Sequence, residues 1–255
     1  EVLVEKVGSQ WKITDNKFLK SERVVSNREP TFTNKTVASG LDRVQIHERS
    51  EAIRRGGYTI VVDDLNNDGE LDLFSGSAQE SQLFLGNGKG KWVAKDSELS
   101  NYKAVKTAVF ADFDNDGDKD SVMTLFEYDQ DASDVVYLKN EGGKYSKVKN
   151  FIKGKLNYNL PMPAAVADFN NDGHLDLYVG FPGKQDFTTL DPSSNTKGEP
   201  EGLFTNMGHS KENEVFKDVT QTFWRDRGLS QYTGLFPHSS VASDYDFDGA
   251  GLSVL

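Results

Sequence analysis

One acidic motif recurs in the same register along most of this chain, and it constrains the fold more than any other feature. Complete copies occupy Asp64–Asp72, Asp112–Asp120 and Asp168–Asp176, and an incomplete copy begins at Asp244. Successive copies start 48, 56 and 76 residues apart. Periods of about 50 residues are typical of propellers and other arrays, in which each repeat is one structural unit.

Each period also has the sequence pattern of four strands. Apolar, partly alternating stretches flank the motif, as at Tyr58–Val62 and Leu71–Phe74. A hairpin pattern then follows, with two apolar stretches around a turn that is usually rich in Gly and Asn. The hairpins are Leu83–Trp92, Val136–Tyr145 and, with a longer turn, Leu203–Asn206 with Val215–Thr220. No 3.6-residue apolar stripe persists, so helical bundles and βαβ folds are disfavoured.

We therefore predict an all-β fold, namely a β-propeller of four-stranded antiparallel blades. Residues 1–57 are expected to hold N-terminal strands and an incomplete blade, whose last strand is Phe32–Leu41. Repeats with acidic loops are expected at residues 58–103, 104–163 and 164–234, followed by the start of a further, truncated repeat at 235–255. Residues 1–255 thus form one propeller domain or a partial propeller with about four blades.

The motif has the oxygen-rich pattern of a calcium loop. Asp or Asn stands at positions 1, 3 and 5, Gly at position 6 and Asp at position 9, and hard cations prefer such oxygen ligands. Position 7 is chemically diverse, which favours ligation through its backbone carbonyl. The candidate ligands are Asp64, Asn66, Asp68, Glu70 and Asp72; Asp112, Asp114, Asp116, Asp118 and Asp120; Asp168, Asn170, Asp172, His174 and Asp176; and Asp244, Asp246 and Asp248.

Three Ca²⁺ sites are expected from these residues. Glu70, Asp118 and His174 would bind through their backbone carbonyls. The copy that starts at Asp112 is the most acidic and is expected to bind most tightly. The fourth site is expected to be weak or absent, because Leu252 stands at its position 9.

Two other interpretations of the motif compete with a calcium loop of this kind. An EF-hand requires a bidentate glutamate at position 12 and flanking helices. Position 12 is Ser75, Met123 or Val179 here, and the flanks are strand-like, so the EF-hand interpretation fails. A turn without a metal explains a single Asp/Asn/Gly cluster well. It explains three copies that keep the same five positions much less well.

At these residues the chain resembles the FG-GAP/VCBS-type calcium-binding repeats of integrin α-chain propellers and cartilage-acidic-protein-like proteins. Ala111–Asp118, Ala167–Gly173 and Phe216–Thr220 look closest to the second group. The resemblance implies a calcium-loaded propeller, often of seven blades, in a secreted, periplasmic or cell-surface protein used for interaction. Three complete repeats fall short of seven, so the chain is expected to be a fragment or to complete its propeller with a missing segment or another copy.

Composition narrows the function classes. A net charge of −11 disfavours nucleic acid as a partner, and no apolar run is long enough to span a membrane. The absence of cysteine excludes disulfides, Cys-ligated zinc and thiol nucleophiles. No catalytic motif surrounds any of the 4 histidines, so an enzyme is not expected.

The expected function is a calcium-stabilised, non-enzymatic, extracytoplasmic interaction or adhesion module that binds a protein or a glycan. A carbohydrate-binding propeller, with Trp11, Trp92 or Trp224 as stacking platforms, is one alternative. An accessory domain of a polysaccharide-degrading enzyme is another. The insertion Phe181–Gly202 is the expected partner site, and Asn34 lies in a glycosylation acceptor motif.

Overall fold

The computed structural model describes residues 2–7, 10–16, 32–42, 58–77, 80–127, 132–153, 161, 163–181, 201–208, 214–226, 242–243 and 253–254. The chain divides into two compact units, Glu1–Lys35 and Thr36–Leu255. In the first unit, β1 (Val2–Val7) and β2 (Gln10–Asn16) form an antiparallel hairpin. The second unit contains the acidic loops.

Three blades make up most of the described part of the second unit, and each begins with a strand, an acidic loop and a second strand. Blade 1 is β3 (Tyr58–Asp63), β4 (Asp72–Ser77), β5 (Ser81–Gly86) and β6 (Trp92–Lys95). Blade 2 is β7 (Val105–Ala111), β8 (Asp120–Glu127), β9 (Ala132–Glu141) and β10 (Lys144–Val148). Blade 3 is β12 (Ala164–Ala167), β13 (Asp176–Val179), β14 (Gly202–Asn206) and β15 (Phe216–Asp218). Blades 1 and 2 are joined by a short 3₁₀ helix, Glu98–Asn101.

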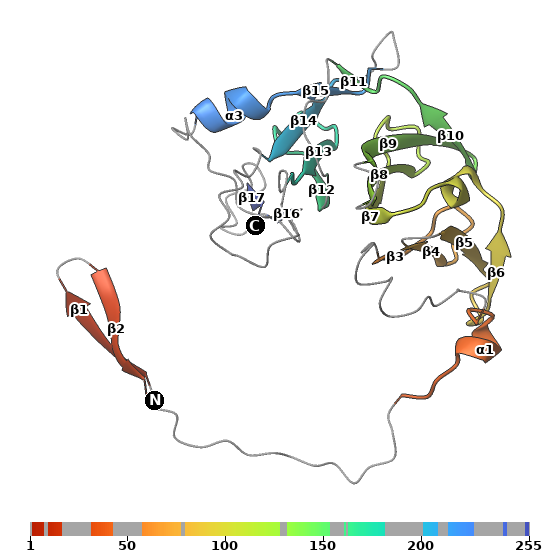
Figure 1. Ribbon diagram of the computed structural model, residues 1–255, viewed down its shortest axis with the longest axis horizontal. Helices are drawn as coiled ribbons and strands as arrows, with labels where there is room; N and C mark the ends of the chain where they lie inside the picture. The colour runs from red at the N-terminus through yellow and green to blue at the C-terminus, as the bar shows by residue number, and fades with distance from the viewer. Residues whose placement is uncertain are drawn as a thin grey trace. The chain divides into compact units, whose positions relative to one another are not determined.

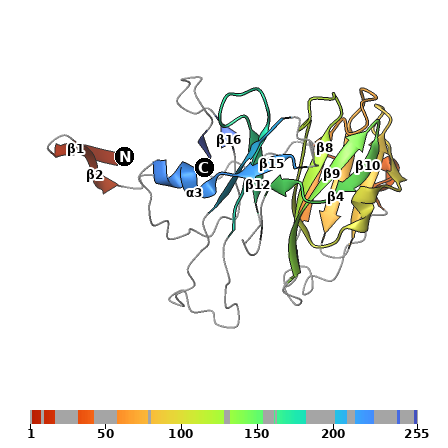
Figure 2. The ribbon, with the colours of Figure 1, turned by 90° about the horizontal axis from the view of Figure 1, so that it is seen from above.

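In each blade these four strands pair antiparallel in chain order. Figure 1 shows the blades side by side, with the first strand of each on the inside and the last strand on the outside. Figure 2, seen from above, shows the sheets of blades 1 and 2 next to each other, with blade 3 beside them. The predicted all-β, propeller-like fold is confirmed.

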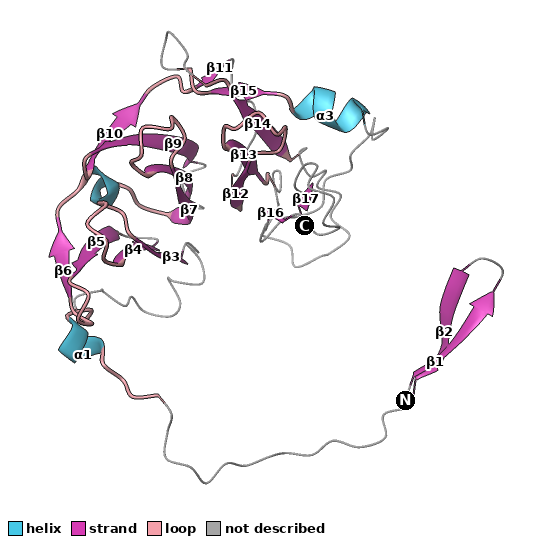
Figure 3. Cartoon of the chain, turned by 180° about the vertical axis from the view of Figure 1, so that it is seen from behind, coloured by secondary structure: helices cyan, strands magenta, loops and turns pink. Residues whose placement is uncertain are grey.

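Blade 3 has a fifth strand that the sequence pattern did not predict. The short strand β11 (Ile152–Lys153) pairs parallel with β15 at the outer edge of this sheet (Figure 3). Beyond blade 3, β16 (Ala242–Ser243) pairs antiparallel with β17 (Ser253–Val254). In the sequence these two strands flank the fourth acidic motif.

The core lies between the blades because the middle strands of blade 2 are buried on both faces. Val122 and Tyr137 belong to a cluster shared with blade 3, whereas Met123 and Val136 belong to a cluster shared with blade 1. Neighbouring side chains on a strand point to opposite faces, so alternate residues serve alternate interfaces.

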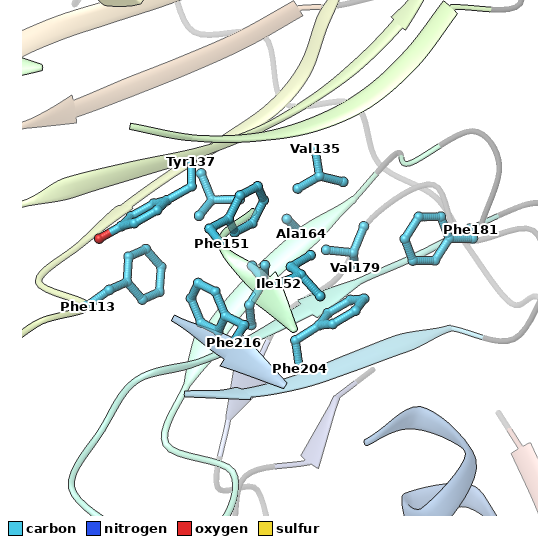
Figure 4. Close-up of a cluster of buried hydrophobic side chains, with 12 residues drawn as sticks. Phe113, Val135, Tyr137, Phe151, Ile152, Ala164, Val179, Phe181, Phe204 and Phe216 are labelled. Carbon is cyan, nitrogen blue, oxygen red and sulfur yellow. The ribbon is translucent and has the colours of Figure 1, made fainter. Parts of the chain in front are cut away.

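Aromatic side chains dominate the interface between blades 2 and 3 (Figure 4). Phe113 of blade 2 and Phe216 of blade 3 are buried, with ring centroids 5.3 Å apart and planes nearly perpendicular. Each buried phenylalanine contributes about 1.5–3 kcal/mol relative to an exposed one, so the blades are held mainly by apolar contact.

The prediction of a strand at Phe32–Leu41 is wrong. Residues 32–35 form no strand, and Thr36–Ser39 form a short helix, α1. The amide of Gly40 donates to the carbonyl of Val37, and the amide of Leu41 donates to the carbonyl of Thr36. Gly40 has φ 83°, which completes a helix C-terminal motif that glycine permits. Thr36 and Val37 therefore lie in a helical turn and not in a strand.

The strand predicted at Val215–Thr220 is shorter than expected. β15 ends at Asp218, and helix α3 (Thr220–Asp226) begins two residues later. Asp218 Oδ1 accepts a hydrogen bond from the Thr220 amide at the start of this helix. Neither this helix nor any other helix of the described residues is long and apolar enough to cross a membrane.

Candidate metal centre

Loop 1 (residues 64–72), loop 2 (112–120) and loop 3 (168–176) fold around the carboxylate at position 1. Asp112 accepts hydrogen bonds from the amides of Asp116 and Gly117, both at 3.0 Å. Asp64 and Asp168 make the same two contacts in loops 1 and 3, at 2.8 to 3.2 Å. The position 1 aspartate therefore closes each loop before any ion is considered.

Left-handed backbone at positions 4 and 6 makes these loops compact. Asn115 has φ 58° and Gly117 has φ 93°, and the other two loops repeat this pattern. Asn is among the non-glycine residues that most readily adopt this conformation. The side chains of positions 1, 3 and 5 consequently gather on one side of the turn.

The clearest candidate metal centre lies in loop 2. Asp112, Asp114 and Asp116 each offer a carboxylate oxygen, and these oxygens lie within 4.8 Å of one another. Calcium–oxygen distances are about 2.3–2.6 Å, so two ligands on opposite sides of one ion are separated by about 5 Å. A cationic group, Lys139 Nζ, already lies 2.6 Å from Asp114 Oδ2. Spacing and donor chemistry both fit a hard divalent cation.

Loops 1 and 3 differ from loop 2 at position 3. Asn66 and Asn170 stand there, and their Nδ2 groups donate to the position 5 carboxylates Asp68 and Asp172 at 3.0 and 2.9 Å. Their Oδ1 atoms accept the position 5 amides, as Asp114 Oδ1 does in loop 2. These two loops share the fold of loop 2 with one carboxylate fewer at positions 1, 3, 5 and 9.

Position 9 joins each loop to the third strand of its own blade. Asp72, Asp120 and Asp176 are fully buried. Asp120 accepts the Tyr137 hydroxyl at 2.7 Å and the Asn140 amide at 2.8 Å. Asp176 likewise accepts the Asn206 amide at 2.7 Å. The structure thus gives these carboxylates a structural role in addition to the ligand role predicted for them.

Burial controls the acidity of position 9. Desolvation raises the pKa of Asp120 to about 6, against the opposing effect of its two hydrogen bonds. The pKa of Asp176 is raised to about 6 for the same reason, and that of Asp72 is also raised. Nearby carboxylates of the same loops add to each shift. A cation in the loop would favour the ionised form and oppose these shifts.

The position 7 side chains of loops 2 and 3, whose backbone carbonyls are the predicted ligands, contact the preceding loop. The Asp118 carboxylate accepts a hydrogen bond from Asn67 Nδ2 at 2.7 Å, and His174 Nδ1 lies 3.1 Å from Asn115 Nδ2. Asn67 and Asn115 are the position 4 residues of the preceding loops. Position 4 of one loop therefore contacts position 7 of the next, which joins the three loops in a row.

A buried asparagine in the third strand strengthens the same junction. Asn206 Nδ2 donates to the carbonyl of Phe113 in loop 2 at 2.7 Å and to that of Leu175 in its own loop at 3.1 Å. Asn140 makes the corresponding pair of contacts between loops 1 and 2. Each asparagine thus holds two successive loops together.

Blade 1 replaces this asparagine with Gly86, where a Cβ would lie 2.0 Å from the Leu71 carbonyl oxygen. Trp92 Nε1 donates to that carbonyl instead, at 3.1 Å. Trp92 pairs with Gly86 as Tyr145 pairs with Asn140, so the two aromatic residues occupy the same strand position in their blades. The indole N–H of Trp92 therefore makes its hydrogen bond within blade 1.

Sequence reasoning missed two sets of residues whose signal was present. Position 2 is apolar in every copy, and Leu65 and Phe113 are buried between blades. Position 4 is Asn in all three complete copies. Both regularities mark contacts with a neighbouring loop or blade.

Some predicted residues lie outside the described part of the chain. These are Asp244, Asp246, Asp248 and Leu252 of the fourth loop and residues 182–200 of the predicted partner site. β16 and β17 pair Ser243 with Ser253, whereas in the other loops the residue before position 1 pairs with position 9. Ser253 therefore stands at the paired place that position 9 takes in the other loops.

The family model for FG-GAP-like repeats matches residues 64–123 and 112–179, which begin at position 1 of loops 1 and 2. This part of the chain is therefore made of FG-GAP-like repeats, as the resemblance predicted. No curated protein matched the chain. FG-GAP repeats occur in extracellular adhesion and interaction modules. The closer resemblance to the cartilage-acidic-protein-like group stays a prediction.

Proposed function

We propose that this chain is a calcium-stabilised, non-enzymatic interaction module of an extracytoplasmic protein. The observation that carries the proposal is the group of three carboxylates in loop 2, Asp112, Asp114 and Asp116, whose oxygens have the spacing of ligands around one ion. Calcium fits better than magnesium, because calcium accepts flexible shells of six to eight oxygens and magnesium keeps its waters.

Three sites are proposed, one in each described loop. Side chains at positions 1, 3, 5 and 9 and the backbone carbonyls of Glu70, Asp118 and His174 supply the ligands. Loops 1 and 3 share the hydrogen bonds of loop 2 around position 1, which supports the same role for them. A site in the loop that starts at Asp244 is proposed to be weak or absent.

The ions would act on the structure of the module. Ion binding offsets repulsion among the loop carboxylates, and the loops are joined to one another through positions 4 and 7. Stabilising one loop therefore supports the junction with its neighbour. This arrangement suits a rigid scaffold that displays a partner site on its connecting segments.

A protein or glycan outside the cytoplasm is the proposed partner, because FG-GAP repeats usually occur in extracellular proteins. The segment Phe181–Gly202 is proposed to contact it. The lectin alternative has less support, since the Trp92 indole is engaged within blade 1. Binding of the chain to a glycan array would favour the lectin alternative, and absence of glycan binding would favour a protein partner.

Calcium titration of the full chain by isothermal calorimetry tests the metal proposal. About three ions per chain are expected, with weak competition by magnesium. Asp112→Asn removes a position 1 ligand and should abolish one of these sites. Asp134→Asn, an exposed aspartate outside the loops, is the control and should leave the stoichiometry unchanged. Absence of calcium binding to the unaltered chain would contradict the proposal.

A further inference from the structure

Lys139 is a cation built into the candidate site of loop 2. Its Nζ atom lies 2.6 Å from Asp114 Oδ2 and 3.4 Å from Asp116 Oδ2. Both aspartates belong to the group of three carboxylates that fits a metal ion. The ammonium therefore uses oxygens that the ion would use.

Strand register identifies the residues that correspond to Lys139 in the other blades. The residue after position 9 pairs with Phe84 in blade 1, Leu138 in blade 2 and Phe204 in blade 3. The next residue along each third strand is Leu85, Lys139 or Thr205. Loops 1 and 3 thus have no charged side chain at this place.

The extra lysine accompanies an extra carboxylate. In loops 1 and 3, the position 3 asparagine donates a hydrogen bond to the Oδ2 atom of the position 5 aspartate. Position 3 of loop 2 is Asp114, which has no such donor when ionised. Lys139 approaches the same oxygen of Asp116 instead and offsets the repulsion between the two carboxylates.

We propose that Lys139 competes with calcium for loop 2. The proposal rests on the calcium-binding function proposed above. Without the ion, the ammonium holds Asp114 and Asp116 together, and when the ion binds, the ammonium leaves them. Glu141 Oε1, 4.0 Å from Nζ, is the next acceptor available to it.

The competition has two consequences. Loop 2 binds calcium less tightly than its carboxylates alone would dictate, and its folding depends less on calcium than that of loops 1 and 3. The sequence-based expectation that loop 2 binds most tightly counted the carboxylates without this lysine. The ammonium of Lys139 thus keeps loop 2, the most acidic loop, folded at low calcium concentration.

The test compares Lys139→Thr, which introduces the residue of blade 3, with the unaltered lysine. Both are placed in a chain that carries Asp64→Asn and Asp168→Asn, so that loop 2 dominates binding. Calorimetric titration with CaCl₂ should show affinity about tenfold higher for the K139T chain, because a unit charge beside a divalent ion is removed. Lys139→Met, which keeps much of the aliphatic stem, should behave in the same way.

Lys147→Thr is the matched control for charge. Lys147 belongs to blade 2 and pairs with Asp134, 3.8 Å away, rather than with the loop. It should change calcium affinity by less than twofold. Thermal unfolding gives a second readout in the otherwise unaltered chain. K139T should lower the midpoint in chelator more than in calcium, whereas a general packing defect would lower both equally.

The outcomes separate the two proposals. If the K139T and K139M chains bind calcium with the affinity of the lysine chain, Lys139 does not compete, and the proposed function stands. If the unaltered chain binds no calcium, the proposed function and this inference both fail. If K147T raises the affinity as much as K139T does, the effect is one of net charge and the inference is overturned.

Discussion

At the residue scale, two tyrosines of blade 2 make contrasting hydrogen bonds. The Tyr137 hydroxyl donates to the buried carboxylate of Asp120 at 2.7 Å, and the Tyr145 hydroxyl donates to the carbonyls of Leu65 and Lys119. Hydrogen bonds to charged groups contribute about 1.5–3 kcal/mol and those to neutral groups about 1 kcal/mol. Tyr137→Phe should therefore lower the free energy of unfolding by about 2 kcal/mol, and Tyr145→Phe by about half as much. Urea unfolding of both variants in chelator checks this, and equal losses would contradict it.

The position 9 aspartates predict a pH dependence. The pKa of Asp120 is about 6 in the folded chain, above the usual value of 3.8, so the folded state binds more protons between these limits. The stability that this group contributes is full below pH about 4 and is lost as the pH rises through about 6. In chelator, this group should therefore make the free energy of unfolding lower at pH 7 than at pH 5. Asp120→Asn should remove this component, whereas Asp134→Asn should leave it. An identical pH profile for wild type and D120N, measured by urea unfolding, would contradict the assignment.

At the element scale, one asparagine connects blade 3 to loop 2. Asn206→Ala removes three hydrogen bonds, one of them from the Gly208 amide to Asn206 Oδ1, and leaves the carbonyls of Phe113 and Leu175 without this donor in a buried place. We expect a loss of about 2–3 kcal/mol in the free energy of unfolding. Asn87→Ala, which alters only an exposed turn within blade 1, should cost less than about 1 kcal/mol. A loss at Asn206 no larger than that at Asn87 would show that the junction does not stabilise the fold.

The same elements show how far sequence reasoning reaches. The strands and acidic loops were predictable, because alternation and turn chemistry are local. The contacts of Asn67 with Asp118 and of Lys139 with Asp114 were not, because they depend on register and on the neighbouring blade. The strand predicted at Phe32–Leu41 failed for a related reason. β-branched residues favour a strand only where a partner exists, and Gly40 instead ends a short helix there.

At the scale of the whole molecule, blade 1 exposes apolar side chains. Ile60 and Val93 are 70% and 71% exposed, and Val62 and Leu71 are more than half exposed. Such side chains on a propeller blade favour association with another polypeptide. We expect this chain to self-associate at micromolar concentration and Ile60→Lys with Val93→Lys to weaken the association. Sedimentation velocity checks this, and a strictly monomeric wild-type chain would contradict it.

The central claim is that calcium stabilises the blades, and thermal unfolding of the full chain in calcium and in chelator tests it most directly. At a Kd of about 10⁻⁴ to 10⁻³ M, millimolar calcium adds about 1 kcal/mol per site. Three such sites should raise the midpoint by about 10 °C, and magnesium should do much less. Elemental analysis of the protein after dialysis against calcium should find the ion. An unchanged midpoint together with no calcium in the protein would contradict the account.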